Sequence, residues 1–250
     1  MKVSIITVCY NSAETIEGAI KSVLGQSYPD IEYIVIDGAS TDGTLEILGK
    51  YKNKIAKIVS EKDSGIYEAM NKGIALATGD IVGILNSDDF YYDNDVVKTV
   101  VENIVKNDAD ACWGDLVYVK KDDTNKVVRF WKSSEYKPGK FIRGWHPPHP
   151  TFFVKRELYQ KYGVFRLDLS VYADYELMLR FLEKYKIKGF YIPKVFIKMR
   201  EGGASNWRSI KKVFRGSMEN YKAFKMNGLK FGFIAVVVKP LSKITQIFSK

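Results

Sequence analysis

The chain has 250 residues, of which 46% are hydrophobic and 14% aromatic, enough to bury the core of one large domain or two small ones. Two cysteines, Cys9 and Cys112, lie in apolar strand-like runs, which excludes a disulfide framework and indicates buried thiols in a reducing compartment. Two histidines, His146 and His149, are too few for a zinc cluster of Cys and His ligands.

Residues 3–85 alternate between strand and helix patterns with short connections. Asn11, with Glu14 three residues later, predicts the cap of the first helix. The order of the elements predicts an α/β fold with a mostly parallel open sheet and helices on both faces. The expected strands are 3–9, 31–36, 55–59 and 81–85, and the expected helices are 16–23, 45–50 and 66–77.

The patterns of the next hundred or so residues are less regular. A helix is predicted at 93–106, and a hairpin of two strands at 111–119 and 127–131. Residues 146–150 should be extended and rigid, because each proline disfavours helix in the residue before it. The remaining expectations are a strand at 151–154, a helix that begins near Tyr172, strands at 187–192 and 195–199, and a flexible loop at 201–205.

Two adjacent carboxylates, Asp88 and Asp89, follow the strand predicted at 81–85. Such a pair is costly at the end of a buried strand unless a cation or hydrogen-bond donors compensate it. Ligands of open α/β sheets bind at the carboxyl ends of the strands. We therefore expect these residues to hold a divalent metal and the sugar-phosphate part of a nucleotide, although a polar turn that caps the next helix would use the same residue types.

Five motifs occur in an order that resembles the family 2 glycosyltransferases of the GT-A fold, especially bacterial enzymes that build surface polysaccharides. The resemblance extends over residues 1–205 and implies one catalytic domain there. It also implies a transferase that uses a nucleoside-diphosphate sugar. The motifs are ITVCYN at 6–11, DGASTDGT at 37–44, DSGIYEAMNKG at 63–73, NSDD at 86–89 and ADYELMLR at 173–180.

The resemblance implies a nucleoside pocket at the ends of the first two strands, formed by Thr7, Val8, Tyr10, Asn11 and Asp37. A carboxylate such as Asp37 accepts the imide N–H of uracil, and an aromatic ring such as Tyr10 stacks on a base, so UDP is the expected nucleotide. The alternative for Asp37 is a turn-forming Asp before Gly.

The same resemblance implies that Asn71, Lys72, Ser87, Asp88 and His149 contact the ribose, the diphosphate or the donor sugar. For Asn71 and Lys72 the alternative is an exposed helical pair, and for His149 it is a histidine hydrogen-bonded within a proline-rich turn.

The resemblance further implies that Asp89, with Asp88, binds Mn²⁺ or Mg²⁺, since hard oxygen ligands and a diphosphate suit these ions. Asp174 matches the general base of the family, whose members invert the anomeric centre in a single displacement. Its alternative role is to cap a helix. Gly202, Gly203 and Ser205 match a mobile loop over the donor.

Residues 206–250 form a basic, amphipathic tail, in which residues 208–250 carry ten basic residues and one acidic residue, Glu219. Its charge and its Phe, Ile and Val content favour an anionic membrane surface over nucleic acid, so we expect a peripheral protein at the inner face of the cell membrane. Apolar residues from Ile210 to Phe224 recur at helical spacing. A helix pair in the membrane plane, broken at Pro240, is one interpretation, and a helix packed on the domain is the other.

Two other functions fit the same composition. A sugar nucleotidyltransferase would share the sheet and the acidic site, but the glycine-rich basic loop that it needs after the first strand is absent. A non-catalytic scaffold would bind the donor without turnover. The expected partners are the donor, a saccharide or lipid-linked acceptor, and the membrane, with no nucleic acid, and a homodimer stays open.

Overall fold

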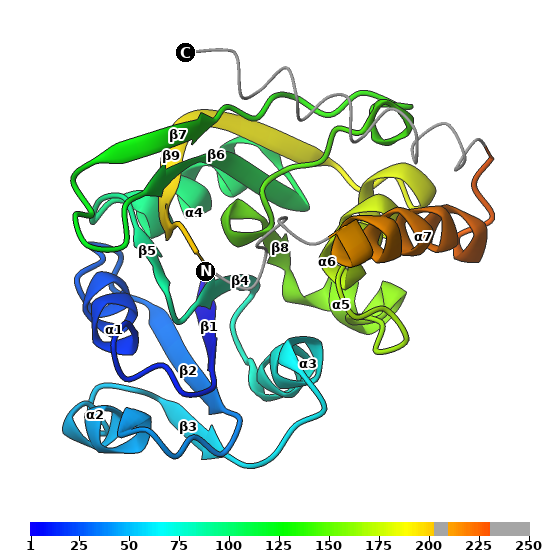
Figure 1. Ribbon diagram of the computed structural model, residues 1–250. Helices are drawn as coiled ribbons and strands as arrows, with labels where there is room; N and C mark the ends of the chain where they lie inside the picture. The colour runs from blue at the N-terminus through cyan, green and yellow to red at the C-terminus, as the bar shows by residue number, and fades with distance from the viewer. Residues whose placement is uncertain (203–209, 231–250) are drawn as a thin grey trace.

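The computed structural model describes residues 1–202 and 210–230. Within this part of the chain, nine strands form one sheet in the order β3-β2-β1-β4-β8-β6-β9-β5, with β7 paired to β6 (Figure 1). The strands are β1 Val3–Cys9, β2 Ile31–Asp37, β3 Lys57–Ser60, β4 Ile81–Asn86, β5 Asp89–Tyr91, β6 Ala111–Val119, β7 Val127–Trp131, β8 Phe153–Lys155 and β9 Gly189–Arg200.

The strands β3, β2, β1 and β4 run parallel, as the sequence predicts. All seven residues of β1 are buried, because helices cover both faces of a parallel sheet and apolar side chains are needed on each. Cys9 pairs with Asp37, and Val8 pairs with Asn86, so three strands end at one level. The loops that follow them therefore meet at the same edge of the sheet.

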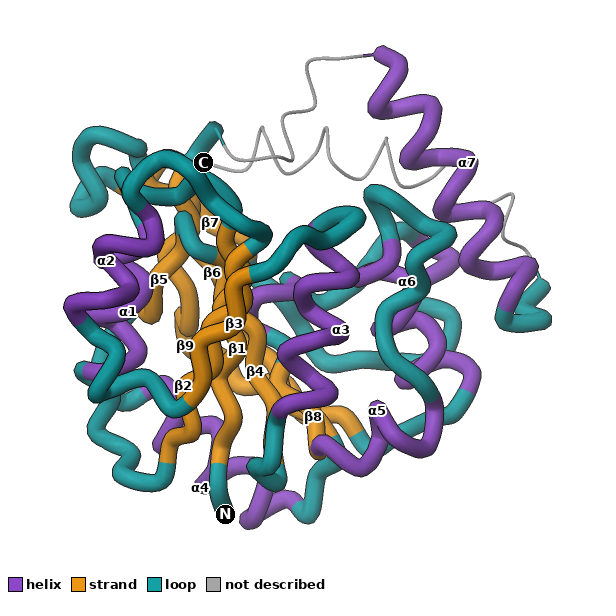
Figure 2. Tube along the Cα trace, turned by 90° about the horizontal axis from the view of Figure 1, so that it is seen from below, coloured by secondary structure: helices purple, strands orange, loops and turns teal. Residues whose placement is uncertain are grey.

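Helices cover the two faces of this sheet, as Figure 2 shows. One face packs against α1, α2 and α4, and the other packs against α3, α5 and α6. The helices are α1 Ile16–Leu24, α2 Thr44–Lys50, α3 Ile66–Leu76, α4 Val96–Asn107, α5 Arg156–Tyr162, α6 Ala173–Leu179 and α7 Ile210–Met226, with short 3-10 turns η1 Phe141–Arg143 and η2 His149–Thr151 and a π-helical turn η3 Arg180–Lys184.

The second half of the sheet is mixed. The predicted hairpin is present as β6 and β7. The prediction of two short strands near the end of the domain is wrong, because residues 189–200 form the single strand β9 beside β6. Pro193 lies where the register between the two strands shifts, so its missing N–H group interrupts no regular ladder hydrogen bond.

The predicted cap of the first helix is also wrong. Helix α1 begins at Ile16, and no side chain caps it. Asn11 has a positive φ of 48°, a conformation that asparagine tolerates, and its side-chain oxygen accepts the N–H of Thr41 at 2.9 Å. Asn11 therefore joins the loop after β1 to the loop after β2.

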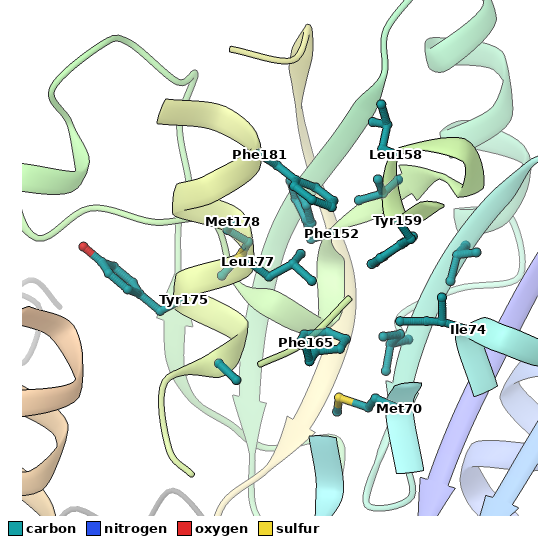
Figure 3. Close-up of a cluster of buried hydrophobic side chains, with 14 of the residues drawn as sticks. Met70, Ile74, Phe152, Leu158, Tyr159, Phe165, Tyr175, Leu177, Met178 and Phe181 are labelled. Atoms are coloured by element: carbon teal, nitrogen blue, oxygen red, sulfur yellow. The ribbon is translucent and has the colours of Figure 1, made fainter. Parts of the chain in front are cut away.

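Helix α7 is packed on α6 and the core beside it. Ala223 and Phe224 are buried in the cluster that includes α3, α5 and α6, part of which Figure 3 shows. Met218 and Tyr221, which the sequence pattern placed on the same apolar face as Phe224, are exposed instead. The part of the tail at 231–250, which contains Pro240, lies outside the described residues. No helix in the described part of the chain is both long enough and apolar enough to cross a bilayer.

A buried carboxylate joins three segments at the amino end of the sheet. Glu32 is 6% exposed and accepts hydrogen bonds from Ser4 Oγ at 2.6 Å, Thr78 N at 2.7 Å and Lys2 Nζ at 3.3 Å. Burial alone would raise the pKa of Glu32, but these donors outweigh it and lower the pKa from 4.5 to about 2.

We predict that Glu32→Gln lowers the free energy of unfolding at pH 7 by about 1–3 kcal/mol, because the amide cannot accept all of these bonds. A group with a depressed folded-state pKa stabilises the fold above its unfolded pKa and loses this contribution as pH falls toward the folded value. Between pH 7 and about pH 3 the wild type should therefore lose more stability than the variant. Urea unfolding at both pH values measures this, and an equal loss in the two proteins would contradict it.

Candidate active site

A pocket of about 990 Å³ lies at the carboxyl ends of β1 and β4. We call its floor the lining residues 8–12, which end β1 and begin the loop after it, and 86–89, which lead from the end of β4 to the start of β5. The sides come from the loop at Asp63 and Gly65, from the first turn of α3, from the β6–β7 hairpin and from the end of β9. These segments are distant in sequence, and the parallel register described above brings the first two together.

Hydrogen bonds fix the two loops that form the floor. The N–H of Asn11 donates to Ser40 Oγ at 2.8 Å, and the N–H of Ser12 donates to Thr44 Oγ1 at 2.8 Å. Ser12 Oγ also lies 2.9 Å from Ser87 Oγ, which joins the loop after β1 to the loop after β4. The backbone of both loops is thus held before any ligand binds.

The carboxylate of Asp89 is fully buried and only partly hydrogen-bonded. Its Oδ2 accepts Asn86 Nδ2 at 2.9 Å, whereas its Oδ1 and the Oδ1 of Asn86 have no partner. Burial, followed by the negative charge of Asp88, raises the pKa of Asp89 well above its usual range. Buried oxygens without donors beside a second carboxylate are the arrangement that a bound cation would complete.

The oxygens present fit a Mg²⁺ or Mn²⁺ ion whose remaining ligands come from elsewhere. Across residues 1–202 and 210–230, no group of three or more His, Cys, Asp and Glu side chains gathers to hold a metal. Asp88 and Asp89 would supply one or two carboxylates, and phosphate oxygens and water would complete the shell, which is the usual pattern for Mg²⁺.

Six of the predicted residues line this pocket: Val8, Tyr10, Asn11, Ser87, Asp88 and Asp89. The ring of Tyr10 is 66% exposed, so it offers a free face at the pocket edge. Gly38 allows this placement, because a Cβ on it would lie 2.9 Å from Asp63 Oδ2 and 3.4 Å from the Tyr10 ring.

Thr7 and Asp37 are buried and are not among the lining residues. Thr7 Oγ1 accepts the hydroxyl of Tyr33 at 3.1 Å. Asp37 accepts the N–H of Ser40 at 3.0 Å and Ser60 Oγ at 2.6 Å. Its carboxylate therefore holds the turn after β2, as the turn interpretation of this residue expects, and the pocket carboxylate on this side is Asp63.

Asn71 and Lys72 are also not among the lining residues of the pocket. The side-chain amide of Asn71 makes two reciprocal bonds with the backbone of Phe165, at 2.8 and 2.9 Å. Lys72 Nζ lies 2.9 Å from Glu61 and donates to the carbonyl of Lys62 at 3.0 Å. Both residues fix the loops beside α3 and neither lines the pocket.

Asp174 and His149 are not among the lining residues and belong to a second cluster, which Tyr67 of α3 contacts. The hydroxyl of Tyr67 lies 3.3 Å from Asp174 Oδ1, and the ring of His149 packs edge-on against Phe165 at 5.6 Å. Burial lowers the pKa of His149, and the negative charge of Asp174 opposes this change. Tyr67 follows Ile66, a residue of the pocket wall, so the two clusters adjoin along α3.

Several pocket residues had no signal in the single sequence. Arg200 donates to the carbonyl of Asp88 at 2.6 Å, and its guanidinium lies 4.8 Å from the ring of Phe90. Lys121, at the tip of the β6–β7 hairpin, pairs with Glu14 at 2.8 Å beside the pocket. Glu201 and Gly202, which belong to the loop predicted at 201–205, also line the pocket, whereas Gly203 and Ser205 of that loop lie outside the described residues.

Comparison with known proteins identifies the family. Residues 4–163 match the model of glycosyl transferase family 2. An uncharacterised glycosyltransferase of Mycobacterium tuberculosis is 35% identical over 181 residues, covering 71% of this chain and 68% of that protein. A PGL/p-HBAD biosynthesis glycosyltransferase of Mycobacterium bovis is 27% identical over 208 residues, covering 81% and 78%.

Solved structures show the same fold. Residues 1–349 of S. aureus TarS in complex with UDP-GlcNAc superpose with a TM-score of 0.68 at 18% identity, covering 91% of this chain and 65% of that one. The mannosyltransferase PcManGT of Pyrobaculum calidifontis, in complex with GDP-Man and Mn²⁺, gives 0.65 at 18% identity, covering 100% and 76%. The fold is thus the one that these two proteins share. The chain belongs to glycosyltransferase family 2.

Proposed function

We propose that the protein is an inverting, metal-dependent glycosyltransferase that moves a sugar from a UDP-sugar to a hydroxyl of a saccharide or lipid-linked acceptor in glycan biosynthesis. The observation that carries this proposal is the buried carboxylate of Asp89 beside Asp88 at the end of β4, where the Oδ1 atoms of Asp89 and Asn86 lack hydrogen-bond partners inside a large pocket. Neither a nucleotidyltransferase nor a scaffold is favoured by a specific feature of this pocket.

The donor would lie along the pocket floor. Tyr10 supplies a face on which the base stacks, and Asp63 supplies a carboxylate close to it. Ser87, Asp88 and Asp89 lie where the ribose and diphosphate would follow. A divalent ion held by Asp88 and Asp89, when bound, supplies Lewis-acid stabilisation of the negative charge on the departing nucleoside diphosphate.

Complexes of related folds support a nucleoside-diphosphate sugar as the class of donor. TarS was solved with UDP-GlcNAc, and PcManGT was solved with GDP-Man and Mn²⁺. The two donors differ in base and sugar but share the diphosphate, so the fold accommodates a nucleoside diphosphate with either base. We infer a uridine donor for this chain from the exposed Tyr10 and the carboxylate of Asp63.

We infer that Asp174 is the general base. It is partly exposed, its Oδ1 accepts the N–H of Tyr175 at 2.7 Å, and the Tyr67 hydroxyl lies 3.3 Å from the same atom. These contacts leave Oδ2 available to take the proton from the attacking hydroxyl. In an inverting displacement the base acts on the acceptor side, opposite the leaving diphosphate, which agrees with its place outside the lining of the pocket that contains Asp88 and Asp89.

We also infer that the tail brings the enzyme to an anionic membrane surface, where lipid-linked acceptors reside. Residues 208–250 carry a net charge of +9, and α7 exposes Met218, Tyr221, Lys222 and Lys225. Basic residues near such a surface contribute on the order of 1 kcal/mol each. The packed face of α7 and this exposed face are compatible, since they lie on different sides of one helix.

A donor screen tests the proposed reaction. The protein, with Mn²⁺ or Mg²⁺, is incubated with UDP-glucose, UDP-galactose, UDP-GlcNAc or GDP-mannose, and the release of nucleoside diphosphate to water is measured. Release from a UDP-sugar supports the proposal. Formation of a UDP-sugar from UTP and a sugar 1-phosphate would support the nucleotidyltransferase instead, and donor binding without turnover would support the scaffold.

The first prediction from this site concerns metal dependence. Asp89→Asn should retain the fold and the bond to Asn86 but lose at least about 100-fold in UDP-sugar turnover, because a charged metal ligand is lost. Binding of UDP, measured by calorimetry with and without Mn²⁺, should become independent of the metal. Asp108→Asn is the matched control, since Asp108 is exposed and has a φ of 44° that asparagine tolerates. Full turnover of Asp89→Asn in chelator would contradict the metal role.

The second prediction separates the base from donor binding. Asp174→Asn should lower turnover by roughly 10²–10⁴-fold, the usual contribution of a general base. Affinity for UDP should change by less than about twofold, because the base acts on the acceptor side. A folded variant that no longer binds UDP would show that Asp174 belongs to the nucleotide half of the site.

The third prediction concerns the tail. Truncation before α7 would remove Phe224 from the core, so the test is truncation after Lys230, which removes three lysines and the apolar run 231–238. We expect binding to vesicles that contain anionic lipid to weaken about tenfold or more, and binding of the full chain to weaken as salt rises.

Neutral vesicles and thermal melting serve as controls for the tail experiment. Release of UDP from the donor in solution should be unchanged, because the described pocket contains no residue after Gly202. If a folded truncated protein binds anionic vesicles as tightly as the full chain, the segment 231–250 makes no contribution to membrane binding.

A further inference from the structure

Helix α7 contacts the segment that leads into the proposed base. The three consecutive backbone N–H groups of residues 170–172 all donate to the carboxylate of Glu219 on α7. Ser170 N lies 3.1 Å from Oε1, and Val171 N and Tyr172 N lie 2.8 and 3.0 Å from Oε2. The hydroxyl of Ser170 adds a fourth bond to Oε1 at 2.9 Å.

The chemistry of Glu219 suits this contact. Its side chain is buried, which would raise its pKa, but the bonds from 170–172 outweigh burial and lower it, so the carboxylate stays charged. Glu219 is the one acidic residue among ten basic residues in 208–250. Lys222, one turn further along α7, lies 3.2 Å from Asp168. Glu219 thus places its carboxylate against the backbone N–H groups of residues 170–172.

The position of α7 is fixed by contacts on either side of Glu219. A Cβ on Gly216 would lie 2.5 Å from the ring of Tyr172, so the absence of a side chain there permits close approach. Asn227 Nδ2 donates to Glu176 Oε1 at 2.8 Å, and Phe224 is buried in the core beside α6. These contacts, which extend from Gly216 to Asn227, hold the helix that carries Glu219 against α6 and the residue before it, Tyr172.

The held segment is tied directly to Asp174. The N–H of Val171 donates to Glu219, and its carbonyl accepts the hydroxyl of Tyr67 at 2.9 Å. The same hydroxyl lies 3.3 Å from Asp174 Oδ1. Asp174 itself follows two residues after Tyr172, at the start of α6. A shift of residues 170–172 would therefore move both the backbone and a side-chain contact of Asp174.

We propose that Glu219 is a positioning residue, which holds residues 170–172 so that Asp174 can accept the proton of the attacking hydroxyl. The proposal rests on the function assigned to Asp174 above. It gives α7 a role in the reaction that is separate from any contact with a membrane. Geometry is the reason to expect an effect on rate, since a displacement of about 1 Å at a reacting group can lower a rate by about 100-fold.

The test compares Glu219→Gln with Glu102→Gln. The first places an N–H₂ group against backbone N–H donors, and the second makes the same change at an exposed residue of α4. Release of UDP from the active UDP-sugar to water is measured, and kcat is divided by the number of UDP-binding sites found by calorimetry. This normalisation removes any loss of folded protein, which is the only effect that a merely structural role would have.

For Glu219→Gln we expect a fall in normalised kcat of about 10–100-fold, with the donor KM and the UDP affinity within about twofold of wild type. Glu102→Gln should match wild type. If Glu219→Gln does not fold, Ser170→Ala removes one of the four bonds and should lower normalised kcat several-fold.

Unchanged normalised kcat in Glu219→Gln, or in Ser170→Ala if that variant must be used, overturns the positioning role. A change in UDP affinity that accounts for the whole effect also overturns it, because Glu219 would then act on the nucleotide half.

The outcome for Asp174→Asn separates this proposal from the proposed function. If that variant keeps full turnover, the base assignment fails; if it is inactive while Glu219→Gln is normal, only the positioning role fails.

Discussion

Three parallel strands end at the same level in this sheet, with Cys9 opposite Asp37 and Val8 opposite Asn86. The pocket depends on this register. A slip of one residue would turn every side chain of a strand to the other face, which is costly when both faces are buried. The loops after β1 and β4 therefore lie side by side, and the hydrogen bond between Ser12 and Ser87 joins them. Polar ligand-binding groups can then be buried at this edge, because the packing of the buried strands offsets the free energy that their burial costs.

The parallel half of the fold could be predicted because its strands are runs of Val and Ile and its helices have clear apolar spacing. Asp88 and Asp89 could also be placed, since two adjacent acids at the end of a buried strand require a cation or hydrogen-bond donors to compensate their charge. Strand β9 was predicted as two strands because Pro193 interrupts the pattern. Whether a strand continues past a proline depends on the register of its neighbour β6, which local sequence does not contain.

Asp37, Asn71 and Lys72 illustrate what a motif does not determine. Each belongs to a motif at the predicted place, but each side chain is held by a partner outside its motif: Asp37 by Ser60, Asn71 by the backbone of Phe165, and Lys72 by Glu61. A motif gives the element and not the direction of the side chain. The same limit applies to α7, where charge counting found a basic tail but not that its one acidic residue is buried against residues 170–172.

The cluster around Glu32 lies at the amino end of the strands that carry the pocket at their carboxyl end. Lys2, Ser4 and Thr78 satisfy a buried charge there, whereas Asp89 keeps an oxygen without a partner at the opposite end. Stability and ligand binding are thus separated along the length of each strand. The sequences of the loops at the carboxyl end can change to bind other donor sugars without loss of the stability that the Glu32 cluster provides at the amino end. Substitutions meant to raise the stability of the enzyme should accordingly preserve the bonds between Thr78 and Glu32 and avoid the pocket.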